Sequence, residues 1–327
     1  MNDHLRFINH REKATEMLGL FLQSNAAAVI GGMNLSDEVT RHCAELLFKG
    51  YTIVRSNFSG AECARAIKEF RAFESSNEEI FAENRDEFGH LKRIVNLHMV
   101  LPAVANLFTA NERLLQISDV LFGGRTALYT SLLYECGSEQ SIHRDAPLFC
   151  TRPEYLYFGN TVYLEAADDQ NGCLEVIERG HLVGELNRER IAQEHYGSLD
   201  VLPLIDVDLW NKYQTLLVER CRQQQLTRKR IHVAAGDSLI WHPLLPHGGS
   251  PILDRTRTRL SVVFHSVPEG VPVYQQDAFF RPSMHYATSP PWGYREADGR
   301  KMVDHKSGVS FDHLRNYPFD AFRPLAG

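Results

Sequence analysis

The spacing of hydrophobic positions near the start of the chain predicts a helix followed by a short strand. Between residues 36 and 49 apolar side chains recur at helical spacing, with Ser36 as a suitable N-cap and Gly50 as the stop. The apolar positions of this helix are Val39, Cys43, Leu46 and Leu47. Residues 51–54 are then apolar enough for a strand.

A second helix follows this strand. Ser59 and Glu62 have the spacing of a capping box, and the apolar pattern continues through Phe70. Residues 76–100 are polar and irregular, whereas the pattern from Leu101 to Asp119 is helical again. The N-terminal part is therefore predicted to be mainly helical.

From Thr126 the pattern changes to short β-rich runs. Gly, Pro, Asp and Asn clusters bound these runs, as is typical of the strands of a sandwich or barrel. The predicted strands are 127–134, 155–164, 173–177, 230–234, 238–241 and 260–265. Between them, residues 187–225 are charged and helical, which we interpret as an insertion over one rim of the β-structure.

After His265 the periodicity is lost. Residues 289–294 form a turn-rich aromatic segment, and residues 311–323 keep several aromatic side chains. A lid, a contact between subunits, or ordinary packing of a tail against the domain would each account for this composition.

The composition excludes several classes of protein. The 327 residues are 43% hydrophobic and 23% charged, which is usual for a globular protein, and the net charge of -6 provides no positive field for nucleic acid or anionic lipid. The apolar runs 26–32 and 239–245 are shorter than the roughly 20 residues of a membrane span. We therefore expect a cytoplasmic protein without a nucleic-acid or membrane partner, either a monomer or a homodimer.

The six cysteines are scattered and form no CxxC pair, so the sequence encodes no local zinc knuckle or dithiol motif. We expect them to be free thiols that are buried as small hydrophobic residues.

The first candidate metal-binding motif along the chain is the triplet His143-Arg144-Asp145, which follows a predicted strand. In an extended segment residues i and i+2 point to the same side, so His143 and Asp145 can converge on one metal ion while Arg144 faces away. Taken alone, the triplet is equally consistent with a surface histidine beside an aspartate.

A second histidine motif strengthens the metal interpretation. The run from Gly236 to Ser250 enters an apolar strand at a glycine turn and ends in His247-Gly248-Gly249, where the backbone can approach a bound group closely. Two histidines and one carboxylate form the facial triad of non-haem Fe(II) oxygenases, which leaves positions for a chelating cosubstrate and O2.

The next predicted strand carries basic residues. Alternation places Arg257, Arg259 and Ser261 on one face and Leu260, Val262 and Phe264 on the other. An arginine beside a hydroxyl suits a cosubstrate with a carboxylate, because Arg binds carboxylates in bidentate fashion. The strand could equally present a solvated basic edge.

Together these motifs resemble the phytanoyl-CoA dioxygenase family of Fe(II)- and 2-oxoglutarate-dependent oxygenases. The resemblance starts in residues 46–70 and continues through residues 168–177 and Gly180-His181, although Glu178-Arg179-Gly180-His181 departs from the family's Gly-Ser-His turn. It covers about residues 40–266.

The resemblance implies that His143, Asp145 and His247 bind iron. The family's 2-oxoglutarate arginine follows the distal histidine by ten or eleven residues, and Arg257 and Arg259 lie ten and twelve residues after His247. We prefer Arg259 for its Arg-x-Ser pattern and keep Arg257 as the second choice. The related halogenases lack the carboxylate, so Asp145 argues against chlorination.

The implied fold is mainly β with flanking helices, namely a double-stranded β-helix, or jelly roll of the cupin type. We expect one catalytic domain over residues 1–327. Its parts are a helical buttress at about 1–125, a core at about 126–266 with the insertion 187–225, and a C-terminal lid or tail at 267–327.

Other residues have weaker predicted roles. Thr161 and Tyr163 share a strand face that would line the cavity, and they are candidate contacts of the cosubstrate or the substrate. The resemblance implies that Ser261 helps Arg259 to hold the distal carboxylate of 2-oxoglutarate. His242 is either a pocket residue or packs behind the barrel. The remaining histidines that we considered are expected to be structural or on the surface: His98, His181, His265 and His285.

The implied reaction uses Fe(II), 2-oxoglutarate and O2, releases succinate and CO2, and hydroxylates an unactivated C–H bond of a small molecule. A specialised metabolite or an amino-acid-like substrate is favoured, and desaturation, cyclisation or stereoinversion would need the same cofactors. Two other classes stay open, a cupin-type metal isomerase or dioxygenase that needs no Arg259, and a non-catalytic binding protein.

Overall fold

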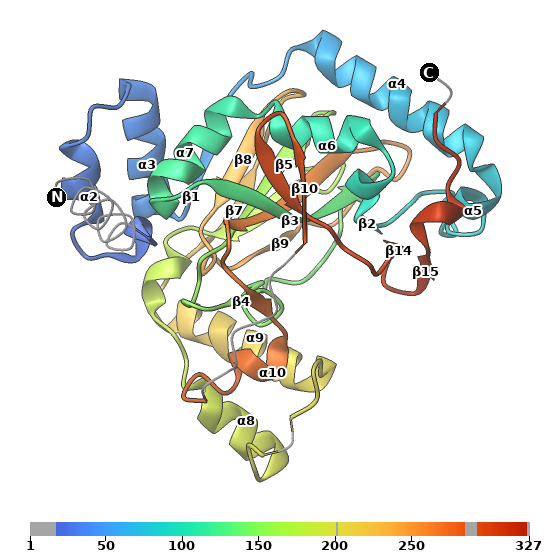
Figure 1. The fold of residues 1–327 in the computed structure, drawn as a ribbon. Coiled ribbons are helices and arrows are strands. Elements are labelled where there is room, and N and C mark those ends of the chain that lie inside the picture. Colours follow the sequence, from blue (N-terminus) through green and yellow to red (C-terminus); the bar gives the residue numbers. More distant parts are fainter. Residues whose placement is uncertain (1–17, 201, 285–292, 326–327) are drawn as a thin grey trace, which may run out of the picture.

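Two β-sheets form the centre of the protein (Figure 1), in a computed structural model that describes residues 18–200, 202–284 and 293–325. The larger sheet contains the central strand order β1-β8-β5-β10-β3. These strands are β1 (Tyr51–Val54), β8 (Ser238–Trp241), β5 (Phe158–Tyr163), β10 (Ser261–Pro268) and β3 (Thr126–Tyr134). Neighbouring strands of this run are all antiparallel.

The smaller sheet contains the strand order β7-β6-β9, and an isolated bridge between His143 and His247 adds a fourth segment. Its strands are β7 (Arg228–Ile231), β6 (Leu174–Ile177) and β9 (His247–Gly249). Along the chain, β3, β5, β8 and β10 lie in the larger sheet, and the 143 segment, β6, β7 and β9 lie in the smaller one. This distribution of strands is that of the predicted jelly-roll core, which is confirmed.

Two helices before the core, α3 and α4, begin at the N-caps that the sequence predicts. Ser36 accepts a hydrogen bond from the Val39 amide, and Gly50 has φ 90° at the end of the helix. Ser59 and Glu62 form the predicted capping box. The elements of this region are η1 (Leu20–Leu22), α2 (Ala26–Gly31), α3 (Asp37–Lys49), α4 (Gly60–Ser76), α5 (Glu78–Ala82), η2 (Leu97–Met99), α6 (Pro102–Thr109) and α7 (Glu112–Phe122).

The prediction of one helix over residues 101–119 was wrong, because α6 and α7 are separate. The break lies at Ala110 and Asn111, and the buried Asn111 side chain hydrogen-bonds Asn57 and Ser238. A side chain that bonds groups outside its own helix favours such a break over a continuous helix.

Several strand boundaries also differ from the predictions. The predicted strand 155–164 is shorter, as β5 (158–163), and β4 (Cys150–Thr151) precedes it. The predicted strand 230–234 is shifted to 228–231, and β10 continues to Pro268 past an irregularity between His265 and Ser266.

The C-terminal segment continues the larger sheet, which its lack of periodicity did not predict. β2 (Ile94–Val95) pairs with β3, β14 pairs with β2, and β13 meets β3. The elements after the core are β11 (Val273–Tyr274), α10 (Gln276–Phe279), β12 (Tyr294–Ala297), β13 (Arg300–Val303), β14 (Val309–Phe311), β15 (Arg315–Tyr317) and η4 (Phe319–Ala321). His285 and residues 289–292 lie outside the described residues.

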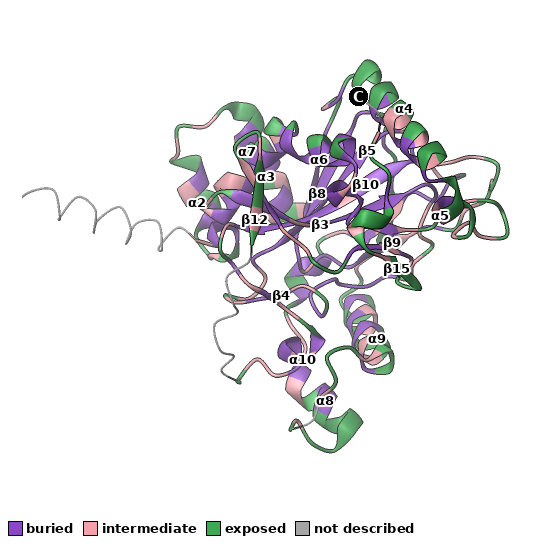
Figure 2. Cartoon of the chain, turned by 45° about the vertical axis from the view of Figure 1, so that its right-hand side comes forward, coloured by how far each residue is buried: buried purple, intermediate pink, exposed green. Residues whose placement is uncertain are grey.

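The insertion forms α8 (Arg188–Tyr196) and α9 (Val207–Gln223), which follow η3 (Gly180–Val183). Both helices lie at the opposite end of the protein from α4 (Figure 1). Figure 2 shows the central strands buried, whereas α4 and α8 each present an exposed face to solvent.

The six cysteines are free and buried, as predicted. None of the helices in the described ranges combines the length and the apolar character that a membrane crossing requires.

Close packing inside the barrel depends on Gly159 in β5. Gly159 is the cross-strand partner of Trp241 in the neighbouring strand β8. A Cβ atom at position 159 would lie 2.2 Å from the indole ring of Trp241. The Trp241 side chain is 3% exposed, so the ring has little room to move away. Gly159 therefore allows the indole to lie across the inner face of the larger sheet.

We expect Gly159→Ala to lower the free energy of unfolding by about 1–3 kcal/mol, because the added methyl group overpacks the core. Urea unfolding followed by circular dichroism measures this loss. Gly31→Ala in α2 is the matched control, since a Cβ there meets no atom within 4 Å. Equal midpoints for the two variants would contradict the assigned role of Gly159.

Candidate metal centre and adjoining cavities

Three buried side chains from distant parts of the chain converge inside the barrel. One ligand atom each from His143, Asp145 and His247 lie within 4.8 Å of one another. The Asp145 carboxylate is 3.3 Å from His143 Nε2 through Oδ1 and 3.3 Å from His247 Nε2 through Oδ2. The structure thus brings together the three residues predicted as iron ligands.

Backbone carbonyl groups fix both imidazole rings. His143 Nδ1 lies 2.7 Å from the Ser141 carbonyl oxygen, and His247 Nδ1 lies 3.0 Å from that of Leu245. A carbonyl only accepts, so each Nδ1 donates its hydrogen and each Nε2 keeps a lone pair facing the other ligands.

The glycines after His247 allow the two ligand segments to approach each other. A Cβ at Gly248 would lie 2.6 Å from the Gln140 carbonyl oxygen, and one at Gly249 would lie 2.6 Å from Ser138 Oγ. The close approach predicted for this motif therefore involves the chain's own 138–142 segment. His143 and His247 also exchange two backbone hydrogen bonds, of 2.8 and 2.9 Å.

The residue between the first two ligands faces away from them, as strand alternation predicts. The Arg144 side chain is fully buried and donates to the carbonyl groups of Leu244, Gly180 and Gly184. Gln214 of α9 hydrogen-bonds both backbone groups of Arg144, each at 2.9 Å. The ligand segment is thereby held from behind by the 242–245 turn, η3 and the insertion.

The electrostatics favour a cation at this position. Burial alone would raise the pKa of the Asp145 carboxyl, but His247, His143 and His265 outweigh it and hold that pKa well below its ordinary value. Burial opposes protonation of His247, yet Asp145 raises the pKa of this imidazole. The Asp145 carboxyl is therefore ionised at neutral pH, and an N/O donor set of this kind suits Fe(II).

A second group of possible ligands is less suitable for a metal. Asp169, Cys173 and His232 also lie close together. However, Asp169 already contacts the Arg230 guanidinium and His232 Nε2, each at 3.1 Å, so its carboxylate is satisfied by neighbouring side chains.

A small cavity of about 60 Å³ lies beside the three ligands. Arg259, Thr161 and Tyr163 contribute to its wall, as do Trp241 and Val263. Arg259 is 6% exposed and has no ion-pair partner among the described residues. Its Nε atom and the buried Ser261 Oγ atom also lack hydrogen-bond partners within the described part of the chain.

Arg257, the alternative arginine, lies elsewhere. Its guanidinium forms two hydrogen bonds with the Asp168 carboxylate, at 3.1 and 2.8 Å, and its side chain is 40% exposed. The structure thus distinguishes a paired, exposed Arg257 from a buried, unpaired Arg259 among the described residues, which the sequence spacing could not do.

His265 also lines the small cavity, although we expected this histidine to be structural or on the surface. Its Nε2 atom lies 3.3 Å from Asp145 Oδ2, and its ring stacks on Phe149 with centroids 4.0 Å apart. Strand alternation could have identified it, because His265 lies on the same face of β10 as Ser261 and Val263, and the same alternation continues back to Arg259.

His242, His98 and His181 do not line the small cavity. His242 packs between Phe21 and His181, which agrees with the alternative that it lies behind the barrel. His98 Nδ1 lies 2.7 Å from Ser131 Oγ, and His181 Nε2 lies 3.0 Å from the Leu47 carbonyl oxygen. These are structural roles.

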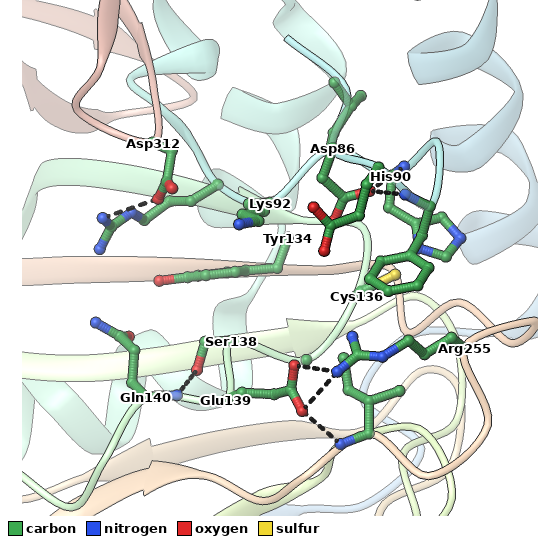
Figure 3. Close-up of a pocket in the computed structure, with 16 residues that line it drawn as sticks. Asp86, His90, Lys92, Tyr134, Cys136, Ser138, Glu139, Gln140, Arg255 and Asp312 are labelled. Carbon is green, nitrogen blue, oxygen red and sulfur yellow. Dashed lines mark hydrogen bonds and ion pairs between the residues drawn. The ribbon is translucent and has the colours of Figure 1, made fainter.

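A second cavity, of about 450 Å³, adjoins the small one. Figure 3 shows its lining side chains, among them Tyr134, Ser138 and Gln140, which also line the small cavity. The two cavities therefore share part of their walls.

The family model for phytanoyl-CoA dioxygenase (PhyH) matches residues 48–257. No curated protein sequence matches the chain. Among solved structures, the epimerase SnoN from nogalamycin biosynthesis, in complex with Fe3+, alpha ketoglutarate and nogalamycin RO, has a TM-score of 0.56 at 16% identity. That match covers 81% of this chain and 98% of SnoN.

Two further structures share the fold. The carbocyclase SnoK, also from nogalamycin biosynthesis, has a TM-score of 0.53 at 15% identity, covering 80% of this chain and 94% of SnoK. EctD from S. alaskensis, solved with 2-oxoglutarate and 5-hydroxyectoine, has a TM-score of 0.53 at 17% identity, covering 74% of this chain and 80% of EctD.

We expect His143→Ala to weaken Fe(II) or Co(II) binding by more than about 100-fold, because losing a ligand costs more than losing an outer hydrogen bond. Anaerobic titration with either metal measures the affinity. His232→Ala, in the second group of possible ligands, should leave it unchanged. The site is assigned wrongly if the two variants show the reverse pattern.

We also expect His265→Phe to weaken metal binding by about 10- to 100-fold, because the stacking on Phe149 is kept while the hydrogen bond to Asp145 is lost. The same titration applies, with the melting temperature recorded to show that the variant folds. A folded variant with wild-type affinity would show that the histidine serves only packing.

Proposed function

The chain belongs to the phytanoyl-CoA dioxygenase family, and on that premise we propose that it is an Fe(II)- and 2-oxoglutarate-dependent dioxygenase that hydroxylates an unactivated C–H bond of a small molecule. Iron is the metal cofactor, 2-oxoglutarate the cosubstrate and O2 the oxidant. When bound together, these groups supply the oxidising power, with oxidative decarboxylation of 2-oxoglutarate to succinate and CO2.

The observation that carries this proposal is the buried guanidinium of Arg259 beside the candidate metal ligands. A buried cation without a counter-ion is costly, which makes such a site a binding position for an anion. Arg259 with Ser261 would hold the carboxylate of 2-oxoglutarate that is distant from the metal. The orphaned Nε and Oγ atoms are the donors available for it.

The other residues of the site position and enclose the reactants. His143, Asp145 and His247 would hold Fe(II), with His265 orienting the carboxylate of Asp145. Thr161 and Tyr163 line the wall next to Arg259 and would contact the cosubstrate. Trp241, which is 3% exposed, covers His247 and keeps bulk water from this side of the site.

Hydroxylation is the outcome that we propose, and a specialised metabolite or an amino-acid-like molecule is the substrate. The fold is compatible with other oxidative outcomes, since the epimerase SnoN and the carbocyclase SnoK share it. Asp145 occupies the carboxylate position that halogenases lack, which supports oxygenation over chlorination.

The alternatives from other classes differ in their need for Arg259. A cupin-type isomerase, or a dioxygenase that uses no 2-oxoglutarate, would not require a buried arginine without a counter-ion. A non-catalytic binding protein would not consume 2-oxoglutarate. The environment of Arg259 therefore favours the oxygenase.

We expect purified protein with Fe(II) and 2-oxoglutarate under anaerobic conditions to show the weak visible charge-transfer band of the chelate. Arg259→Ala should need about 10- to 100-fold more 2-oxoglutarate for the same band, because charge-assisted hydrogen bonds to one carboxylate are lost. Arg257→Ala is the matched control and should titrate like the wild type, since its guanidinium pairs with Asp168.

An iron-loaded wild type without the band would contradict the use of 2-oxoglutarate and favour the isomerase. Equal titrations of wild type and Arg259→Ala, with a shift in Arg257→Ala, would exchange the roles of the two arginines.

A further inference from the structure

We infer that the larger cavity binds the substrate, and that this substrate is a small zwitterion whose anionic group meets Lys92 and whose cationic group meets Asp86 or Glu87. The inference rests on the proposed function and names the substrate class of that site. Position is its first support, because Tyr134, Ser138 and Gln140 line both this cavity and the one beside the metal ligands. A molecule bound here would reach the reacting centre past these side chains.

The character of the lining is the second support. Charged and polar side chains dominate the wall, and the apolar ones, such as Leu91 and Ile252, are a minority. A long acyl chain needs a continuous apolar channel, because its burial is favourable only against apolar surface. A volume of about 450 Å³ with this lining suits a compact polar molecule.

Most charges of the wall neutralise one another. Arg93 pairs with Asp312 at 3.1 Å, and Arg255 pairs with both oxygens of Glu139 at 2.9 and 3.2 Å. Figure 3 shows these ion pairs as dashed lines on the two sides of the cavity.

The remaining charges are one ammonium and two carboxylates. Lys92, Asp86 and Glu87 have no ion-pair partner among the described residues, and all three line the cavity. Asp86 Oδ1 accepts hydrogen bonds from the backbone of Phe88 and His90, each at 2.9 Å, which fixes its carboxylate. The cavity therefore offers both a cation and anions to a ligand, which is the complement of a zwitterion.

The wall that carries these charges is held in place. The buried Glu135 carboxylate, at the end of the strand that also carries Tyr134, accepts hydrogen bonds from Arg71, Arg85 and the Leu91 amide. Opposite, the Arg255 guanidinium lies 4.7 Å from the centre of the Phe88 ring. These contacts pre-organise the 85–92 segment, so the ligand would not have to order it.

The test uses the full chain with Fe(II) and 2-oxoglutarate, and measures succinate release with each proteinogenic L-amino acid as the probe. Decanoyl-CoA and decanoic acid are the acyl counter-probes. We expect an amino acid to stimulate succinate release, with its KM raised about 10- to 100-fold in Lys92→Met and largely restored in Lys92→Arg. Lys68→Met, at an exposed position of α4, is the matched control and should match the wild type.

A readout that is independent of turnover accompanies this assay. Calorimetric titration of the same amino acid should show the same Lys92 dependence, and Glu87→Gln should weaken binding as well. The charge-transfer band should be unchanged in Lys92→Met, because Lys92 lines only the larger of the two adjoining cavities.

The inference is overturned if the band forms but decanoyl-CoA, decanoic acid or no probe stimulates succinate release, or if Lys92→Met leaves KM unchanged. Absence of the band would instead overturn the proposed function. If the band is absent, calorimetric binding of an amino acid that depends on Lys92 would still support a zwitterion as the ligand of the larger cavity. If no such binding is measured, the zwitterion is refuted as well.

Discussion

The geometry of the metal centre depends on satisfying one buried charge, the guanidinium of Arg144. A fully buried arginine is strongly unfavourable unless its donors are paired, so its carbonyl partners at Leu244, Gly180 and Gly184 constrain the fold. Leu244 belongs to the turn that leads into His247. One buried cation thus holds the segment with His143 and Asp145 against the segment with the third ligand.

The local features of this fold follow from short-range rules and were therefore predictable. The caps at Ser36 and Ser59 depend on side chains within a few residues. The opposite orientation of His143 and Arg144 depends only on strand alternation. The resemblance to a known family then supplied the jelly-roll topology, which no local pattern contains.

The features that the sequence left open or missed depend on partners far away in the chain. Spacing does not distinguish Arg257 from Arg259, because the difference is made by Asp168, which pairs with the former. The break before Asn111 depends on Asn57 and Ser238, and the strands after residue 293 depend on β2 and β3. His265 is a different case, because alternation placed it on the correct face but did not reveal its contact with Asp145.

The bridge between His143 and His247 has a consequence for the stability of the whole barrel. A metal ion shared by these residues would act as a cross-link that closes the chain between positions 143 and 247, a segment that includes β5, β6, β7, β8 and the insertion. Closing a long loop removes many conformations from the unfolded chain, and a ligand that binds only the folded state stabilises it further. The metal would then tie two distant segments of the smaller sheet together, so that metal loading would also increase the resistance of the fold to proteolysis.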